Sequence, residues 1–158
     1  MMKVLFVCLG NICRSPMAEG LFQYQLEEHR LTGLISCDSA GTIDFHQGNL
    51  PDPRMRSTAA KHGIELTSRS RPISEEDFRE FDYIIVMDDS NMRDVMAIRS
   101  RVGQVKAEVL KMRAFDNNQS GKDVADPYTS SMDGFEECFR VLEESTANLL
   151  THVRKELP

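Results

Sequence analysis

The residues best suited to chemistry stand near the start of the chain, where Cys8 and Arg14 are separated by five residues and Ser15 follows. A cysteine thiolate is a nucleophile, and arginine carries a planar, permanently charged fork that matches two phosphate oxygens. The intervening run is Leu9-Gly10-Asn11-Ile12-Cys13. Its glycine and asparagine tolerate the left-handed backbone angles of a tightly curled loop. Such a loop can surround a phosphate with N–H groups and hold the Cys8 sulfur beneath the phosphorus.

The elements on either side of this loop suit that role. Residues 3–7 are apolar and rich in β-branched and aromatic types, which predicts a buried strand. Ser15 and Pro16 predict a helix start, with Ser15 as the N-cap and Pro16 in the first helical position. N–H groups and the helix dipole converge at such a junction, which favours the thiolate form of Cys8. Taken singly, each of these residues is better explained as a buried cysteine or as part of a capped turn. Their combination at this junction favours phosphate chemistry.

The rest of the chain alternates between strand and helix patterns. Further strands are expected over 34–39, 83–87 and 108–112, and helices over 16–30, 54–62, 88–98 and 134–155, with another beginning at Ser74. This alternation predicts a parallel sheet covered by helices on both faces. The 158 residues are therefore expected to form one domain, a small doubly wound α/β sandwich with four strands and the phosphate-binding loop after the first of them.

Charge and composition narrow the function further. The formal net charge is −6, so the chain is a poor candidate for binding nucleic acid or an anionic membrane surface. No export signal is visible and no apolar stretch approaches the roughly 18 residues of a membrane span, so we expect a cytoplasmic protein without membrane insertion. No two of the four cysteines have CxxC spacing and the four histidines are scattered, so no metal site is expected.

Several motifs together resemble the low-molecular-weight protein tyrosine phosphatases over nearly the whole chain. They are Val7-Cys8-Leu9-Gly10-Asn11-Ile12-Cys13-Arg14-Ser15-Pro16, Asp38-Ser39-Ala40-Gly41-Thr42, Pro51-Asp52-Pro53-Arg54, Phe81-Asp82-Tyr83-Ile84 with Met87-Asp88, and Asp126-Pro127-Tyr128. The resemblance implies a single phosphatase domain over residues 1–158. Its expected reaction is hydrolysis of phosphotyrosine in proteins, and of aryl phosphates, through a phosphocysteine at Cys8. Neither a metal nor another cofactor is expected, and the active site is expected to bind phosphate or a similar oxyanion.

The resemblance also assigns roles that the residues alone do not. By itself Asp126-Pro127 in a polar loop indicates a turn, whereas the resemblance makes Asp126 the general acid and base, aimed by the proline that follows it. It implies that Phe45 and Tyr128 form the walls of the substrate pocket. It also implies that Asn11 braces the loop with Ser39 and His62 as its supporting shell.

The remaining cysteines are expected to differ in role. Cys13 lies in the same curled loop as Cys8, and the resemblance implies a reversible disulfide between them that shields the nucleophile from over-oxidation. The alternative is that Cys13 is a small apolar filler of the loop. Cys37 and Cys138 are expected to be buried core thiols.

Three other functions use related features. An arsenate reductase of the same fold is the leading alternative, but that chemistry needs further cysteines to relay a disulfide, and residues 70–100 contain none. A catalytically idle phosphotyrosine-binding module would be expected to lack Cys8 or Asp126. A phosphocysteine carrier like the sugar enzymes IIB would not need the acid of Asp126-Pro127-Tyr128.

Overall fold

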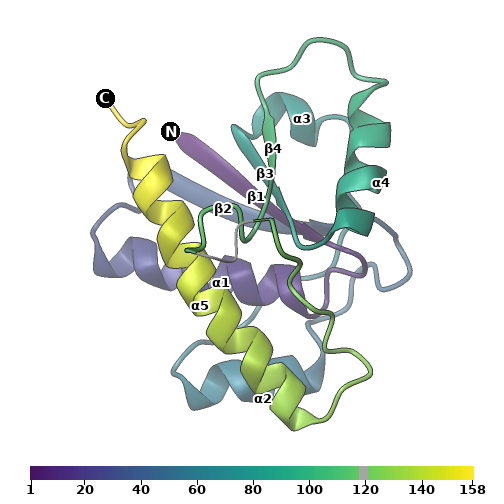
Figure 1. Cartoon of the computed structure of the whole chain (residues 1–158), viewed down its shortest axis with the longest axis vertical. Helices are drawn as coiled ribbons and strands as arrows, with labels where there is room; N and C mark the ends of the chain where they lie inside the picture. The colour runs from purple at the N-terminus through teal and green to yellow at the C-terminus, as the bar shows by residue number, and fades with distance from the viewer. Residues whose placement is uncertain (118–120) are drawn as a thin grey trace.

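The computed structural model describes residues 1–117 and 121–158 and contains a parallel sheet of four strands (Figure 1). The strands are β1 (Met2–Cys8), β2 (Ile35–Gly41), β3 (Tyr83–Val86) and β4 (Glu108–Lys111), in the spatial order β2-β1-β3-β4. The chain passes from β1 to β2 on one side and then crosses to β3 on the other side. The strand order therefore reverses at β1, and ligands of such sheets bind at the carboxyl end of that point.

Helices cover both faces of the sheet, as predicted. The first face carries α1 (Arg14–Glu28) and α5 (Met132–Arg154), which in turn contacts α2 (Pro53–Lys61). The second face carries the short α3 (Asp77–Glu80) and α4 (Asp89–Arg99). No helix in the part of the chain that the structure describes is long and apolar enough to cross a membrane.

The alternation of side chains along β1 divides the core in two. Val4 and Phe6 join a cluster with α1 and α5, while Leu5 and Val7 join a second cluster beneath α3 and α4. All four side chains are fully buried, because a central strand of a parallel sheet is covered on both faces. This packing places Cys8, the last residue of β1, at the edge of the sheet where β1 meets the first helix.

Two predicted helix starts differ in the structure. The first helix begins at Arg14, with Cys13 rather than Ser15 in the N-cap position, because the Ser15 hydroxyl bonds to the Cys8 sulfur and the Asn11 amide instead. The helix expected from Ser74 is a single turn, Asp77–Glu80, because the bonds that precede it are i→i+3 turns and the backbone is extended again at Phe81. Elsewhere the predicted elements are confirmed, with ends shifted by about one or two residues.

Candidate active site

The loop between β1 and α1 is held from outside by its carbonyl groups. Asn11 has a positive φ of 55°, which lets the chain turn sharply at this point. Four loop carbonyls accept hydrogen bonds from surrounding segments: Cys8 from the N–H of Thr42, Leu9 from that of Ile43, Ile12 from that of Asp52, and Gly10 from the Ser70 hydroxyl. The N–H and C=O of a peptide unit point in opposite directions, so this arrangement aims loop N–H groups toward the enclosed space.

A cavity of about 210 Å³ opens on the concave side of this loop. Its lining is Cys8, Leu9, Gly10, Ile12, Cys13, Arg14, Ile43, Phe45, His46, Asp126 and Tyr128. The structure thus brings together the predicted nucleophile, arginine, acid and both aromatic residues. Cys8 and Arg14 are buried in its depth, whereas Phe45, 81% exposed, and Tyr128 stand at its rim.

The sequence reasoning did not identify two of the lining residues. The His46 ring lies edge-on to Phe45, with centroids 4.9 Å apart, and 6.4 Å from the Tyr128 ring. It also rests against Gly10, where an added Cβ would lie 3.0 Å from the imidazole. Ile43 contributes a further apolar surface. The only sequence signal for these residues is their place next to Phe45 in the loop after β2.

Arg14 is fixed by two acidic residues from different parts of the chain. Its guanidinium is 2% exposed; Nη1 donates to Asp88 at 2.7 Å and to the Val124 carbonyl at 2.9 Å, and Nη2 lies 3.6 Å from Asp126. Burial alone would lower the pKa of Arg14, but the Cys8 sulfur and the bond to Asp88 outweigh it and raise the pKa. Arg14 therefore stays charged and keeps one orientation.

Asp88 was not predicted to belong to the site. Asp88 comes just after β3, and Cys8 is the last residue of β1, which pairs with β3 in parallel. The carboxyl ends of adjacent parallel strands meet at one edge of the sheet. The position of Asp88 after an apolar strand was therefore the sequence signal for its place in the site. Burial favours the neutral acid, but the hydrogen bonds from Arg14 and from the N–H of Asn91 outweigh it and lower the pKa of Asp88. Asp88 is also the N-cap of α4.

Asp126 is held in place by its own local turn. Its Oδ1 accepts from the N–H of Tyr128 at 3.1 Å, while Oδ2 faces Arg14. The side chain is 41% exposed, at the mouth of the cavity. Pro127 restricts the backbone of Asp126 to extended angles, and the Asp126 side chain lies on the cavity lining.

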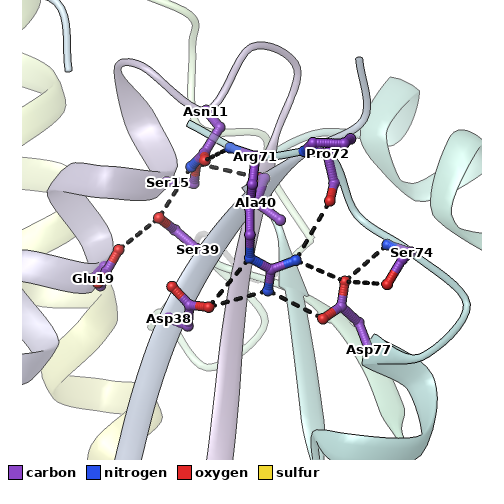
Figure 2. A network of polar contacts seen from close by, with 10 residues as sticks. All are labelled: Asn11, Ser15, Glu19, Asp38, Ser39, Ala40, Arg71, Pro72, Ser74 and Asp77. Atoms are coloured by element: carbon purple, nitrogen blue, oxygen red, sulfur yellow. Dashed lines mark hydrogen bonds and ion pairs between the residues drawn. The ribbon is translucent and has the colours of Figure 1, made fainter. Parts of the chain in front are cut away.

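A chain of hydrogen bonds supports the loop from behind (Figure 2). The Asn11 amide donates to Ser39 at 3.0 Å and to Ser15 at 2.8 Å, and Ser39 donates its own proton to Glu19 at 2.6 Å. Each hydroxyl can donate one proton. The proton of Ser15 is therefore free for the sulfur of Cys8, at 3.0 Å, or the carbonyl of Ala40, at 3.4 Å. Of these two acceptors the Cys8 sulfur is the nearer, so the Ser15 hydroxyl is placed to donate to it.

The other end of the Asn11 amide is fixed by Arg71, not by His62. The backbone N–H of Arg71 donates to Asn11 Oδ1 at 3.0 Å, and its guanidinium binds Asp38 and Asp77 (Figure 2). The structure places His62 elsewhere: its ring stacks on Phe139 and its Nε2 lies 2.6 Å from Glu136, both on α5. Ser39 contacts Asn11, and its supporting role stays a prediction. The expectation that His62 belongs to this shell is wrong, because His62 ends α2 facing α5.

All four cysteines are free thiols in the structure. Burial raises the pKa of Cys13 and of the half-buried Cys37 far above the ordinary range, and raises that of Cys138 to about 12. Cys138 is a core residue as predicted, whereas the expectation that Cys37 is a buried core thiol is wrong, because Cys37 is only half-buried at the margin of the core. Among the described residues, no group of three or more His, Cys, Asp or Glu side chains is arranged to hold a metal ion.

Residues 3–158 match the family model described as low molecular weight phosphotyrosine protein phosphatase. The chain belongs to this family. It is 42% identical to a putative low molecular weight protein-tyrosine-phosphatase of Synechocystis over 156 residues, 99% of each chain. It is 39% identical to the human low molecular weight phosphotyrosine protein phosphatase over 138 residues, 87% of each chain.

Solved structures of the phosphatase family share the fold. A protein tyrosine phosphatase of Entamoeba histolytica is 37% identical and covers 98% of each chain, with a TM-score of 0.89. An arginine phosphatase of Drosophila is 31% identical and covers 98% of this chain and 99% of its own, with a TM-score of 0.91. Phosphatases named for two different phosphorylated residues therefore resemble this chain closely, and the choice between those substrates rests on the cavity.

Proposed function

We propose that this phosphatase hydrolyses phosphotyrosine in proteins, and aryl phosphate monoesters, through a phosphocysteine at Cys8. The observation that carries the proposal is the meeting of Cys8, Arg14 and Asp126 on one cavity, with the thiol in its depth and the carboxyl at its mouth. A phosphate that enters the cavity would bring its phosphorus to Cys8 in the depth. Its ester oxygen would then lie nearer the mouth, beside Asp126.

In the first step the Cys8 thiolate attacks phosphorus, so an S–P bond forms and the P–O bond to tyrosine breaks. Asp126, as the neutral acid, gives its proton to the leaving oxygen and becomes a carboxylate. Arg14 and the loop N–H groups bind the three oxygens that remain on phosphorus and stabilise the charge that they share in the transition state. Because Asp88 and Val124 already orient Arg14, little reorganisation is needed.

In the second step water attacks the phosphocysteine. The Asp126 carboxylate takes a proton from this water, the S–P bond breaks, and inorganic phosphate forms. The departing sulfur carries a negative charge that the Ser15 hydroxyl, 3.0 Å away, is placed to stabilise. At the end of the second step, Cys8 is again a thiolate and Asp126 again carries its proton.

The rim of the cavity favours an aromatic substrate. Phe45, His46 and Tyr128 surround the mouth, and Ile43 adds an apolar surface. Planar rings pack well against such walls. A phosphorylated guanidinium would instead seek carboxylates, and among the described lining residues Asp126, already beside Arg14, is the one carboxylate. We therefore assign phosphotyrosine rather than phosphoarginine as the substrate.

The test uses the purified protein in the presence of a metal chelator. Hydrolysis of p-nitrophenyl phosphate is expected, and Cys8→Ser should abolish it, whereas turnover by that variant would disprove the nucleophile. A phosphotyrosine peptide should be hydrolysed much faster than a matched phosphoarginine peptide, and the reverse preference would overturn the substrate assignment. Arsenate reduction coupled to a thiol reductant would favour the reductase alternative.

We further propose that the whole chain, residues 1–158, acts as one phosphatase domain in the cytoplasm. A phosphocysteine mechanism needs Cys8 as a free thiol, and thiols persist where the compartment is reducing. The four free cysteines are consistent with this requirement. The location can be tested by fractionating cells and assaying the protein alongside cytoplasmic markers.

A further inference from the structure

A lysine outside the cavity, Lys111 at the end of β4, is surrounded by oxygen atoms. Its ammonium lies 2.9 Å from Asp89 Oδ1 and 2.6 Å from Asp123 Oδ1, and donates to the Gly121 carbonyl at 2.5 Å. The side chain is 13% exposed. A lysine ammonium has three N–H donors, so three acceptors engage it fully and fix its geometry. Asp89 and Asp123 are 68% and 47% exposed, but the largely buried lysine restricts the geometry more than an ion pair in which both side chains move freely.

The segment that Lys111 holds leads directly to Asp126. The N–H of Val124 donates to the Met87 carbonyl at 2.7 Å, and the Val124 carbonyl accepts from Arg14 at 2.9 Å. Asp123 also accepts from the N–H of Asp89 at 3.2 Å, at the N-terminus of α4, where the helix dipole favours a carboxylate. Lys111 therefore fixes the chain immediately before Asp126, whose carboxylate faces Arg14.

Charge explains why a cation is needed at this position. Arg14 pairs with Asp88 and Asp126, and Lys111 pairs with Asp89 and Asp123. Without the charge of Lys111, the carboxylate of Asp123 would approach that of Asp89 with no cation between them. The two carboxylates would repel each other, so residues 121–124 would move away from α4 and Asp126 would move with them.

We propose that Lys111 is a positioning residue for the general acid, holding residues 121–124 so that Asp126 faces Arg14 and the leaving oxygen. Lys111 does not line the cavity, and its main route to the reaction is the position of Asp126. The inference rests on the proposed function, because it requires Asp126 to donate the proton.

The test compares two esters that differ in their need for an acid. Phenyl phosphate has a poor leaving group and needs protonation, whereas p-nitrophenyl phosphate has a good one. For Lys111→Met we expect kcat/KM on phenyl phosphate to fall about tenfold, a part of the roughly 100- to 10,000-fold that a general acid supplies. On p-nitrophenyl phosphate the loss should stay below about twofold, since the nucleophile is untouched and Arg14 keeps its bond to Asp88 when the contact with Val124 loosens. Lys111→Arg should restore the activity on phenyl phosphate.

Lys106→Met is the matched control. Lys106 lies two residues before β4, pairs with Asp82 at 3.0 Å and is 62% exposed, so its substitution should leave both esters unaffected. Asp123→Asn provides a second variant, should Lys111→Met fail to fold, and should lower the phenyl phosphate activity selectively. Equal losses on both esters, or none in a folded Lys111→Met protein, would overturn the inference.

Combining the variants separates this inference from the proposed function. If Lys111 acts through Asp126, then Lys111→Met should cost nothing further in the Asp126→Asn background. A full additional loss there would overturn the positioning role. If Asp126→Asn itself slows both esters equally, the general-acid assignment fails, and the inference fails with it. If Asp126→Asn is selective and Lys111→Met is not, only the inference is wrong.

Discussion

Replacing Asp88 with asparagine would remove the negative charge that pairs with Arg14 but would keep a side chain that caps α4. Asp88 Oδ2 accepts from Arg14 at 2.7 Å, and Oδ1 accepts from the N–H of Asn91 at the start of α4, also at 2.7 Å. Asparagine caps helices about as well as aspartate does, so Asp88→Asn tests the charge alone. Asp88→Ala removes both the charge and the cap.

The structure sets the size of the expected effect. A hydrogen bond to a charged group contributes about 1.5–3 kcal/mol. Arg14 is almost fully buried, so water replaces Asp88 poorly, but the contacts with Val124 and Asp126 remain. We expect the free energy of unfolding of Asp88→Asn to fall by about 2 kcal/mol, or about 4–8 °C in Tm for a domain of this size. Asp88→Ala should lose about 1 kcal/mol more because the cap is also gone.

The activity of the two variants should follow a different order from their stability. A misoriented Arg14 stabilises the transition state less, and about 2 kcal/mol corresponds to about 30-fold in kcat/KM. This loss depends on the charge and not on α4, so Asp88→Asn and Asp88→Ala should be equally slow. The assays are hydrolysis of p-nitrophenyl phosphate and thermal unfolding followed by circular dichroism.

The same contact predicts the pH dependence of stability. Although burial favours the neutral acid, the bond from Arg14 keeps the pKa of Asp88 below its usual value. Its contribution to stability is therefore present above the ordinary aspartate pKa of about 4 and is lost as the pH falls through the lowered pKa. Asp88→Asn should be less stable at neutral pH and should approach the wild-type protein in acid.

Three results would refute this reasoning. Wild-type kcat/KM in Asp88→Asn would show that Arg14 keeps its orientation without a charged partner. An Asp88→Ala variant much slower than Asp88→Asn would place the effect in α4 instead. A constant stability difference between wild type and Asp88→Asn at all pH values would contradict the pKa argument.

Three further predictions concern the surroundings of the site. Ser39→Ala removes a buried acceptor from Asn11, so we expect about 1–3 kcal/mol less stability in urea unfolding and a lower kcat. Arg71→Met breaks an ion pair with a buried carboxylate and, discounted for partial exposure of the guanidinium, should cost about 1–2 kcal/mol; Arg79→Met, at an exposed pair, should cost less than about 0.5 kcal/mol. Iodoacetate at neutral pH should modify Cys8 before the other three cysteines, whose raised pKa values keep them as thiols, and mass spectrometry would reveal any other order.

Local sequence determined the elements and the central chemistry of the site. The run from Cys8 to Arg14 could be interpreted without a structure because nucleophile, loop and arginine are neighbours in the chain, between an apolar strand and a helix. The alternation of strand and helix patterns likewise predicted the parallel sheet, since burial on both faces requires nearly continuous apolar strands. Phe45, Tyr128 and Asp126 were placed by resemblance to the family, and the structure brings them to the same cavity.

Tertiary structure decided what holds these groups in position. Arg14 meets Asp88 across 74 residues, and Asn11 meets Arg71 across 60. Ser15 follows the local rule for an N-cap, yet its hydroxyl is taken by Cys8 and Asn11, because the curled loop brings both within hydrogen-bond distance. The orientation of His62 similarly depends on how α2 packs against α5.

Lys111 illustrates the difference most clearly. In the sequence it is one basic residue at the end of a short strand, with nothing nearby to indicate a role. Only the folding of β4 beside β3 brings its ammonium between Asp89 and Asp123. Residue type and spacing along the chain thus determine which groups can react. The packing of distant strands determines their orientation, because a hydrogen bond or ion pair requires two groups within a few ångströms, whatever their separation in the sequence.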